Sequence, residues 1–275
     1  MLPDGGSARV SLVLQVSDTH FGTERSEVVE ALVGLAAQLK PDLIVLSGDL
    51  TQRARESEFA AYRAFVARLL PAPCLAVPGN HDIPLFDLAT RLTRPFRVYA
   101  ASCGERLEPS FGLPDLFITG VNSVRPWRHK QGCLAAAQVA GVAERLRHAG
   151  PAAMRVVVVH HPLDVSDGLD PGDIVRGAAD AVSAWASAGA DLVMSGHVHQ
   201  PLCRALAVRY GPSAGRCWVA VAGTAVSGRT RRGWPNSVNV LRIERFQGVE
   251  RRVLEQWDFD PTRGAFRLGA TFELP

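Results

Sequence analysis

The sequence predicts an α/β fold: a four-layer α-β-β-α sandwich of two stacked mixed sheets with flanking helices. Short apolar runs alternate with amphipathic helical patterns over most of the chain, and strand-like alternation replaces them after Pro201. The 275 residues, 47% hydrophobic and 21% charged, have the composition of an ordinary globular protein. We expect one domain over residues 1–275, with a flexible N-terminus at 1–9 and a β-rich C-terminal part of the same domain at 202–275.

The first part of the chain predicts three strands separated by two helices. The strands are short, apolar and rich in β-branched residues: Val10–Val16, Leu43–Leu46 and Cys74–Val77. The first helix has one apolar face and ends at Pro41; the face is formed by Val28, Leu32, Leu35 and Leu39. The second ends before Pro71, with Phe59, Tyr62, Val66 and Leu69 on its apolar face.

The middle of the chain predicts three more strands and two more helices. The strands are Leu116–Val121, Val156–Val159 and Leu192–Met194. One helix is indicated by Val139, Val142 and Leu146 and closes at Gly150. The other is indicated by Ile174, Ala178, Ala181 and Trp185, with Gly189 as its C-terminal cap. From Asp87 to Asp115 the pattern does not decide between a cover over the pocket and a homodimer contact.

The last part predicts strands alone. Four segments alternate as in an antiparallel sheet: Leu202–Arg209, Arg216–Ala222, Ser237–Glu244 and Val253–Phe259. The loop before the third of them carries several arginines, among them Arg229.

Composition argues against several classes of protein. No apolar run approaches the roughly 20 residues that a membrane-spanning helix needs, and the N-terminus lacks the pattern of a signal peptide. The net charge is +3 without a basic stripe, which argues against a nucleic-acid partner. The five cysteines are odd in number and form no C-x-x-C pair, so we expect buried free thiols and a cytoplasmic protein.

Histidine and aspartate gather where the predicted strands end. Six of the eight histidines lie in four short segments, each directly after a strand, and Asp18 and Asp49 occupy the same kind of position. In open α/β sheets ligands bind outside the carboxyl ends of the strands, so these side chains meet at one rim. Imidazole and carboxylate together suit Mn, Fe, Zn or Co.

Seven such groups exceed the needs of one ion. A shared carboxylate with six further ligands fits two divalent ions about 3.5–4 Å apart. Two carboxylates and a bridging hydroxide leave part of the charge of these ions unneutralised, so the site would attract a phosphate oxygen. The sequence thus predicts a dinuclear centre that acts on a small phosphoester.

Five motifs in order resemble the calcineurin-like metallophosphoesterase superfamily. They are Asp18-Thr19-His20, Gly48-Asp49, Gly79-Asn80-His81-Asp82, His160-His161 and Gly196-His197-Val198-His199. The chain is similar to the bacterial branch that includes cyclic-nucleotide phosphodiesterases, through Gly48-Asp49-Leu50-Thr51-Gln52 and through Gly223-Thr224-Ala225 followed by Pro235-Asn236-Ser237.

The resemblance implies a role for each matching residue. Asp18, His20 and His199 would hold the first metal ion; Asn80, His160 and His197 would hold the second. Asp49 would bridge the two ions. His81 would bind no metal and would protonate the leaving oxygen. The ions would be Mn, Fe or Zn, or a mixed pair.

The function so implied is hydrolysis of phosphodiesters, such as a cyclic nucleotide or a glycerophosphodiester-like ester. A metal-bridging hydroxide would attack phosphorus, with His81 as general acid. One alternative is a pyrophosphatase acting on a nucleotide-linked lipid precursor, although relatives with that task can carry Arg where His81 stands. Another is a metal-binding interaction scaffold without turnover.

Three further side chains have open roles. His161 is either a substrate contact or a packed ring beside the ligands. Arg229 is either a phosphate-binding cation or part of a solvated loop. Trp127 either stacks on the substrate or packs on the core.

Overall fold

The computed structural model describes residues 9–275 except 152, 232 and 248, so the N-terminal segment expected to be flexible lies outside the described residues apart from Arg9. The strands are β1 (Arg9–Val16), β2 (Leu43–Leu46), β3 (Cys74–Ala76), β4 (Ser110–Leu113), β5 (Leu116–Val121), β6 (Met154–Val159), β7 (Leu192–Ser195), β8 (Leu202–Ala205), β9 (Trp218–Val221), β10 (Ser237–Phe246), β11 (Val249–Asp260) and β12 (Ala265–Leu274). The α-helices are α1 (Ser26–Leu39), α2 (Glu56–Leu69), α3 (Leu88–Thr93), α4 (Arg97–Cys103), α5 (Ala136–Arg147), α6 (Ala178–Ser187) and α7 (Ala207–Tyr210).

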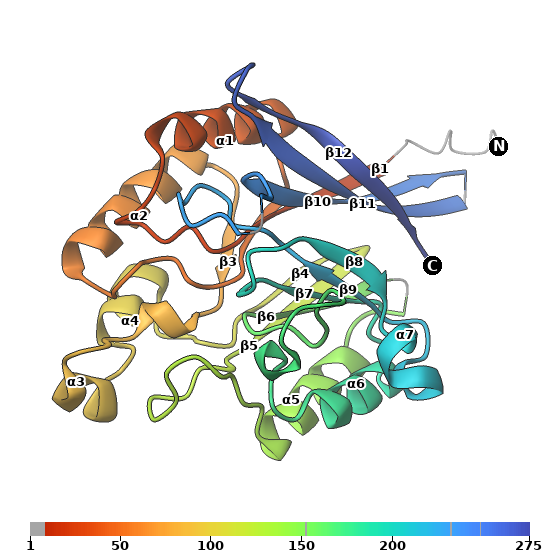
Figure 1. The fold of residues 1–275 in the computed structure, drawn as a ribbon. Helices are drawn as coiled ribbons and strands as arrows, with labels where there is room; N and C mark the ends of the chain where they lie inside the picture. The colour runs from red at the N-terminus through yellow and green to blue at the C-terminus, as the bar shows by residue number, and fades with distance from the viewer. Residues whose placement is uncertain (1–8, 152, 232, 248) are drawn as a thin grey trace.

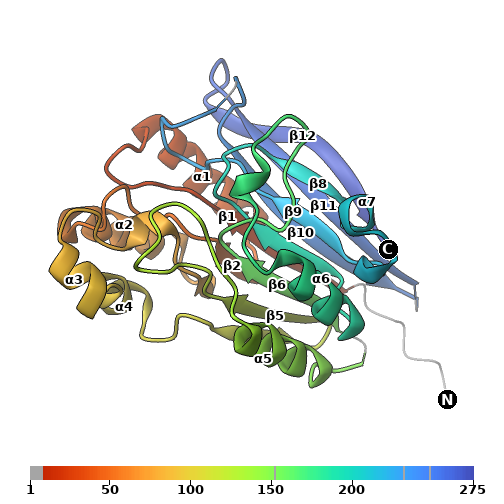
Figure 2. The same cartoon turned by 60° about the horizontal axis from the view of Figure 1, so that its bottom comes forward.

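Two six-stranded mixed sheets stack face to face, which confirms the predicted fold class (Figures 1 and 2). The first has the order β12-β11-β10-β1-β2-β3, and the second has the order β4-β5-β6-β7-β9-β8. Apolar side chains from both sheets fill the space between them, including Val13, Val45, Val156 and Met194. Helices α1 and α2 cover the outer face of the first sheet, and α5 and α6 cover that of the second.

The helices begin and end largely where their apolar spacing predicts. In α1 the predicted face is buried at Val28, Leu32 and Leu35, and Lys40 ends the helix in the left-handed conformation just before Pro41. In α6 Trp185 is fully buried and donates its indole N–H to the carbonyl of Val139, 3.1 Å away. This contact joins α6 to α5.

The prediction for the start of α6 was wrong at Ile174. Gly177 adopts φ +86° directly before the helix, so the helical run starts at Ala178 and excludes Ile174. The prediction that Gly189 closes the helix is confirmed. Gly189 follows the last helical residues at φ +87°, its N–H donates to the carbonyl of Ala186, and the N–H of Ala190 donates to that of Trp185.

The C-terminal part departs from the predicted single antiparallel sheet. Strand β8 stops at Ala205, and the residues expected to extend it form α7 instead, because Leu206 is buried and Tyr210 lies one helical turn beyond it. Strand β9 pairs parallel to β7 in the second sheet, while β10, β11 and β12 extend the first sheet. Strand β12 and the elements α3, α4 and β4 were not predicted.

The topology brings the strand ends that matter to one seam between the sheets. Strands β1, β2 and β3 are parallel in the first sheet, and β6 and β7 are parallel in the second. Below their carboxyl ends the buried Gln15 side chain donates to Ser47 Oγ at 3.1 Å and to the carbonyl of Ser195 at 2.9 Å. Since Ser195 belongs to the second sheet, this amide holds the two sheets in register under the seam.

All five cysteines are free thiols, as predicted, but only Cys217 is buried, and Cys74 is exposed. Within the described residues, no helix combines the length and apolarity needed to cross a membrane.

A buried carboxylate anchors the long loop that follows β6. Asp164 is fully buried and accepts from Arg204 at 2.7 and 2.9 Å and from Arg209. Burial raises the pKa of Asp164, but the hydrogen bonds from the two arginines outweigh it and hold the pKa below its ordinary value. The ionised form therefore stabilises the fold.

We expect Asp164→Asn to lower the free energy of unfolding by about 2 kcal/mol at pH 7, because the two arginines lose the negative charge and one of the two oxygens that accept from them. The loss should shrink as the pH falls below about 4, where the unfolded wild-type chain takes up a proton, and should vanish below the folded-state pKa. Urea unfolding of metal-free protein at pH 7 and pH 3 measures both effects. Asp167→Asn is the matched control, because Asp167 is 93% exposed and lies 3.5 Å from the same Arg204. An equal loss in both variants would contradict this role of Asp164.

Candidate metal centre

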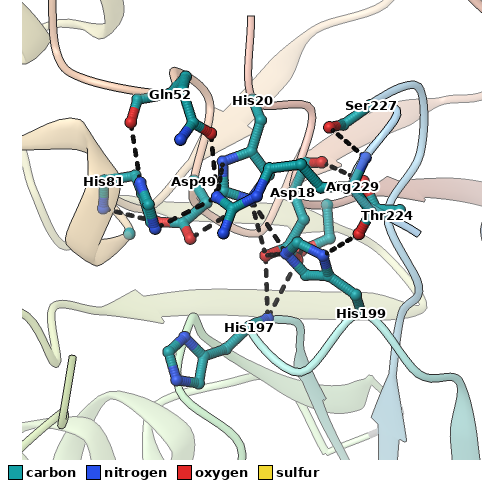
Figure 3. A network of polar contacts seen from close by, with 12 residues as sticks. Asp18, His20, Asp49, Gln52, His81, His197, His199, Thr224, Ser227 and Arg229 are labelled. Carbon is teal, nitrogen blue, oxygen red and sulfur yellow. Dashed lines mark hydrogen bonds and ion pairs between the residues drawn. The ribbon is translucent and has the colours of Figure 1, made fainter. Parts of the chain in front are cut away.

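Loops that follow β1, β2, β3, β6 and β7 bring the predicted ligands together at the seam. Within these loops, groups of three ligand atoms lie within 4.8 Å of one another: Asp18, His20 and His199; His20, Asp49 and His81; Asp18, Asp49 and His160; and His160, His161 and His197. Figure 3 shows His20 and Asp49 side by side with Asp18, His199 and His197 around them.

Asp49 lies between two sets of histidines. Its Oδ2 is 3.6 Å from His20 Nε2, and its Oδ1 is 3.3 Å from His160 Nε2. The backbone N–H of His81 donates to Oδ1 at 2.8 Å and fixes the carboxylate in this orientation. One oxygen of a single carboxylate therefore faces each set, which is the arrangement that a bridging ligand requires.

On one side of Asp49, three ligand atoms converge. Asp18 Oδ1 lies 3.2 Å from His199 Nε2, which is 3.0 Å from His20 Nε2. The Asp18 carboxylate also accepts from Ser17 Oγ at 2.6 Å and from the backbone N–H of His197 at 3.0 Å. Two imidazole nitrogens at 3.0 Å with a carboxylate beside them suit a shared cation.

On the other side, three buried polar atoms have no hydrogen-bond partner in the part of the chain that the structure describes. They are Asn80 Oδ1, His160 Nε2 and His197 Nε2. Leaving a buried polar atom unpaired costs about 1–3 kcal/mol, so three of them in one place call for a partner. An amide oxygen and two imidazole nitrogens can all coordinate a divalent metal. These three residues therefore fit the second metal ion that the sequence predicts.

Backbone carbonyls set the orientation of two of the rings. His160 Nδ1 lies 2.9 Å from the carbonyl of Ser47, and His199 Nδ1 lies 2.7 Å from that of Arg229. Because a carbonyl only accepts, each Nδ1 carries a proton, which leaves Nε2 as the nitrogen that can offer a lone pair to the centre when the ring is neutral.

The site is built from strained backbone and close approaches. Five of the seven predicted ligands have positive φ values, between 43° and 73°, which residues other than glycine rarely adopt. They are Asp18, His20, Asp49, His197 and His199. Two glycines of the motifs are required by proximity. A Cβ on Gly79 would lie 2.2 Å from Asp49 Oδ1, and one on Gly196 would lie 2.2 Å from Asp18 Oδ2.

Burial and charge together set the protonation of the ligands. Burial lowers the pKa of His20 to about 3, despite the charges of Asp49 and Asp18, and lowers the pKa of His197 well below its ordinary range. Burial acts against ionisation of Asp49 as well, but the charge of His160 holds the pKa of Asp49 well below its usual value. Burial lowers the pKa of His160 in turn, but the charge of Asp49 outweighs burial and raises it to about 9, so His160 must lose a proton before it can coordinate a metal ion. Neutral imidazole and ionised carboxylate are the forms that coordinate metals.

The His81 ring lies at the edge of the centre, and its orientation is fixed. Its Nδ1 lies 2.8 Å from the carbonyl of Gln52, so Nδ1 carries the proton and Nε2 faces the ring of His20 and the guanidinium of Arg229. The ring is half-buried, in contrast to the buried rings of the other histidines at the seam.

Arg229 reaches into the site from the segment between β9 and β10 (Figure 3). Its Nη1 lies 2.9 Å from Gln52 Oε1, 3.3 Å from His20 Nδ1 and 3.4 Å from His81 Nε2. The segment is fixed by bonds at several points, including Thr224 Oγ1 to the carbonyl of Asp18 at 2.6 Å. The structure thus places Arg229 beside His81 and not in a solvated loop.

His161 is held by the protein at both ring nitrogens. Ser123 Oγ lies 2.7 Å from Nδ1, and Nε2 lies 2.8 Å from the carbonyl of Lys130. The residue is 1% exposed, and its ring centroid is 4.5 Å from that of His197. Neither nitrogen is free for a substrate, so the ring lies behind the centre and supports His197.

Two residues of the sequence motifs, Gln52 and Asp82, make contacts at the site that the motifs do not specify. Gln52 holds His81 with its carbonyl and Arg229 with its side chain, and only its place three residues after Asp49 hinted at this. Asp82 accepts from the backbone N–H groups of Gly79, Leu50 and Thr51, which ties the loop after β3 to the loop after β2. Burial and the charge of Asp49 raise the pKa of Asp82 to about 7, against these three hydrogen bonds.

The chain is similar to curated bacterial phosphodiesterases. It is 36% identical over 94 residues to the 3',5'-cyclic adenosine monophosphate phosphodiesterase CpdA of Escherichia coli K12, a match that covers 30% of this chain and only 33% of that protein. It is 28% identical over 210 residues to a probable cyclic nucleotide phosphodiesterase of Synechococcus, covering 71% of this chain and 76% of the relative. With the glycerophosphodiester phosphodiesterase GpdQ of Enterobacter lignolyticus it shares 30% identity over 179 residues, covering 58% and 60%.

Solved structures share the fold at low sequence identity. Purple acid phosphatase PPD1 from yellow lupin superposes with a TM-score of 0.65 at 14% identity, covering 98% of this chain and 55% of the plant protein. GAP50 of Plasmodium superposes with a TM-score of 0.63 at 11% identity, covering 96% and 88%.

The family model described as calcineurin-like phosphoesterase matches residues 11–201, which is more than half of the chain and contains every one of the five motifs. The chain therefore belongs to the calcineurin-like phosphoesterase family.

Proposed function

We propose that this protein hydrolyses phosphodiesters with two divalent metal ions bound at the seam. The observation that carries the proposal is the position of Asp49, whose two oxygens face the Nε2 atoms of His20 and His160 at 3.6 and 3.3 Å. We propose Asp18, His20 and His199 as ligands of one ion and Asn80, His160 and His197 as ligands of the other, with Asp49 shared. Residues 1–275 act as one catalytic domain.

Metal ions held by these ligands supply Lewis-acid chemistry, which polarises a phosphoryl group and lowers the pKa of water. The chain's own residues do the rest. The carbonyls of Ser47 and Arg229 keep the lone pairs of His160 and His199 aimed at the centre. The buried setting excludes bulk water and strengthens each charge interaction there.

His81 is the proposed general acid. Its Nδ1 donates to the carbonyl of Gln52, so the proton that moves is the one at Nε2, which faces the centre. Transfer of that proton to the departing ester oxygen prevents an alkoxide from leaving unprotonated. Arg229, 3.4 Å from the same Nε2, is placed to bind a phosphoryl oxygen of the substrate.

The names of the relatives support a diester substrate, because both the cyclic nucleotide and the glycerophosphodiester enzymes cleave diesters. The five free thiols support a reducing, cytoplasmic location.

Loss of the shared carboxylate should abolish the centre. We expect Asp49→Asn to retain at most one metal ion per chain and to lower kcat on bis-p-nitrophenyl phosphate at least about 100-fold. In the wild type, Mn²⁺ at a free concentration of about 100 times its Kd should raise the Tm by roughly 5 °C per ion. Metal content and thermal melts measure both. Asp164→Asn removes a buried carboxylate outside the centre and should keep its metal. If the loaded wild type binds two ions without hydrolysing any phosphoester, the scaffold alternative replaces this proposal.

The role of His81 predicts a dependence on the leaving group. His81→Ala keeps the backbone N–H that holds Asp49, so the metal content should not change. Its kcat should fall roughly 100- to 1,000-fold on alkyl phosphodiesters and less than about tenfold on p-nitrophenyl esters, whose leaving group needs little protonation. Steady-state kinetics on the two substrate types measure this. An equal loss on both types would exclude His81 as the acid.

Arg229 should contribute to substrate binding through its side chain alone. Arg229→Gln keeps the carbonyl that orients His199, so we expect normal metal content and a KM for the diester raised roughly tenfold. The control Arg231→Gln removes an exposed cation from the same segment and should leave KM unchanged. A loss of bound metal in Arg229→Gln would point to a structural role instead.

A further inference from the structure

The segment that follows the proposed acid exposes an unusual amount of apolar surface. Phe86, Leu88, Leu92 and Trp127, here named the α3 patch, are 80, 63, 64 and 72% exposed. They lie on α3 and on the two segments beside it, which follow β3 and β5. Leu88, Leu92 and Trp127 line a hollow of about 280 Å³, together with Leu85, Arg91, Pro126 and His129.

A buried arginine holds this surface in shape. Arg91 is 6% exposed and donates to three backbone carbonyls: to Pro126 at 2.6 Å, to Arg128 at 2.7 Å and to Pro84 at 2.8 Å. These bonds join α3 to the segments on both sides of it. The hollow is therefore a fixed feature of the fold, and the nitrogens of Arg91 are occupied by carbonyls.

The α3 patch adjoins His81. Residues 83–86 continue directly from the His81 loop, and Arg53, next to the Gln52 that holds His81, lies with its guanidinium carbon 5.7 Å from the centre of the Phe86 ring. His129 in the wall of the hollow is close enough to His81 to feel its charge: burial, Arg91 and His81 together lower the pKa of His129.

Position relative to the acid decides what the hollow can hold. A general acid must touch the departing oxygen, so the leaving alcohol of the substrate lies on the His81 side of the phosphorus. The walls there are mostly aliphatic and aromatic. Of the two titratable groups in the walls, Arg91 is bonded to backbone carbonyls, which leaves His129 for contact with a ligand. A nucleobase buried there would leave its polar edge largely unpaired, whereas an alkyl chain would not.

Charge favours a small amphipathic anion over a second copy of the chain. Arg53 and Arg128 flank the patch, and the nearby Asp87, whose pKa the hydrogen bonds from Thr90 lower, offsets only part of their positive charge. A two-fold contact through this face would bring the same cations of both copies together, which is unfavourable. A phosphoester with an apolar tail would place its charge at the metal centre and its tail on the patch.

We propose that the hollow beside α3 is the leaving-group subsite, and that the substrate is a phosphodiester of an alcohol with an aliphatic chain. This inference rests on the proposed phosphodiesterase function, because it uses His81 to define the leaving-group side.

The test is calorimetric binding of phosphate, ethyl phosphate, butyl phosphate and octyl phosphate to Mn²⁺-loaded protein. Affinity should rise roughly twofold to fourfold for each methylene that the hollow buries. The double variant Leu88→Ser/Leu92→Ser should bind inorganic phosphate like the wild type and lose most of the gain from ethyl to octyl. Leu70→Ser is the matched control, since Leu70 is 63% exposed like Leu88 and lies at the end of α2. It should keep the gain.

Three outcomes overturn the subsite. One is an affinity that does not depend on chain length in the wild type. Another is adenosine monophosphate that binds more tightly than octyl phosphate and weakens in the double variant, which would make the hollow a base site. The third is a wild-type dimer in sedimentation that the double variant dissociates. Because binding is measured apart from turnover, a protein that binds octyl phosphate with a chain-length dependence but hydrolyses no phosphoester would contradict the proposed function. The hollow would then remain an alkyl-binding site without a leaving-group role.

Discussion

The buried carboxylate of Asp49 is the constraint on which the rest of the structure depends. An ionised carboxylate removed from water is costly unless positive charge surrounds it, and the loops at the seam provide imidazoles on both of its sides. Its orientation is fixed by one backbone N–H, that of His81, so the proposed bridge and the proposed acid are parts of the same short turn. The side chain of Asp82 joins this turn to the loop after β2, because it accepts from the backbone N–H groups of both Gly79 and Leu50.

The two sheets divide the proposed ligands between them. Asp18, His20, Asp49 and Asn80 follow strands of the first sheet, whereas His160, His197 and His199 follow strands of the second. The centre therefore exists only when the sheets are stacked in the correct register. The amide of Gln15, bonded to Ser47 in one sheet and to Ser195 in the other, sets that register directly beneath it. The geometry of the site therefore depends directly on how the two sheets pack in the core.

The sequence predicts what depends on local pattern and misses what depends on distant packing. Strand β2, helix α1 and the motif residues follow from apolar spacing and from the polar residues that end each strand. The start of α6 does not, because Gly177 at φ +86° interrupts the helical spacing that begins at Ile174 in the sequence. Three features depend on partners far away in the chain: the existence of β12, the pairing of β9 with β7, and the end of β8 where α7 begins. At the site, the ligand set was readable as strand-end side chains. The carbonyl of Gln52 that holds His81 and the carbonyl of Lys130 that holds His161 leave no mark in a sequence. The contact of the Ser123 hydroxyl with His161 joins residues far apart in the chain.

The left-handed backbone of five proposed ligands has a consequence for how this protein can change. Each such residue costs the fold of order 1 kcal/mol or more relative to glycine, a cost that bound metal offsets. Replacement of one of them by glycine would remove a ligand and relax the chain in the same step. In the metal-free chain such a replacement would therefore increase folding stability, whereas in the metal-bound chain it would also remove the stabilisation that the metal provides. Metal binding and selection for turnover together keep the strained ligands in place.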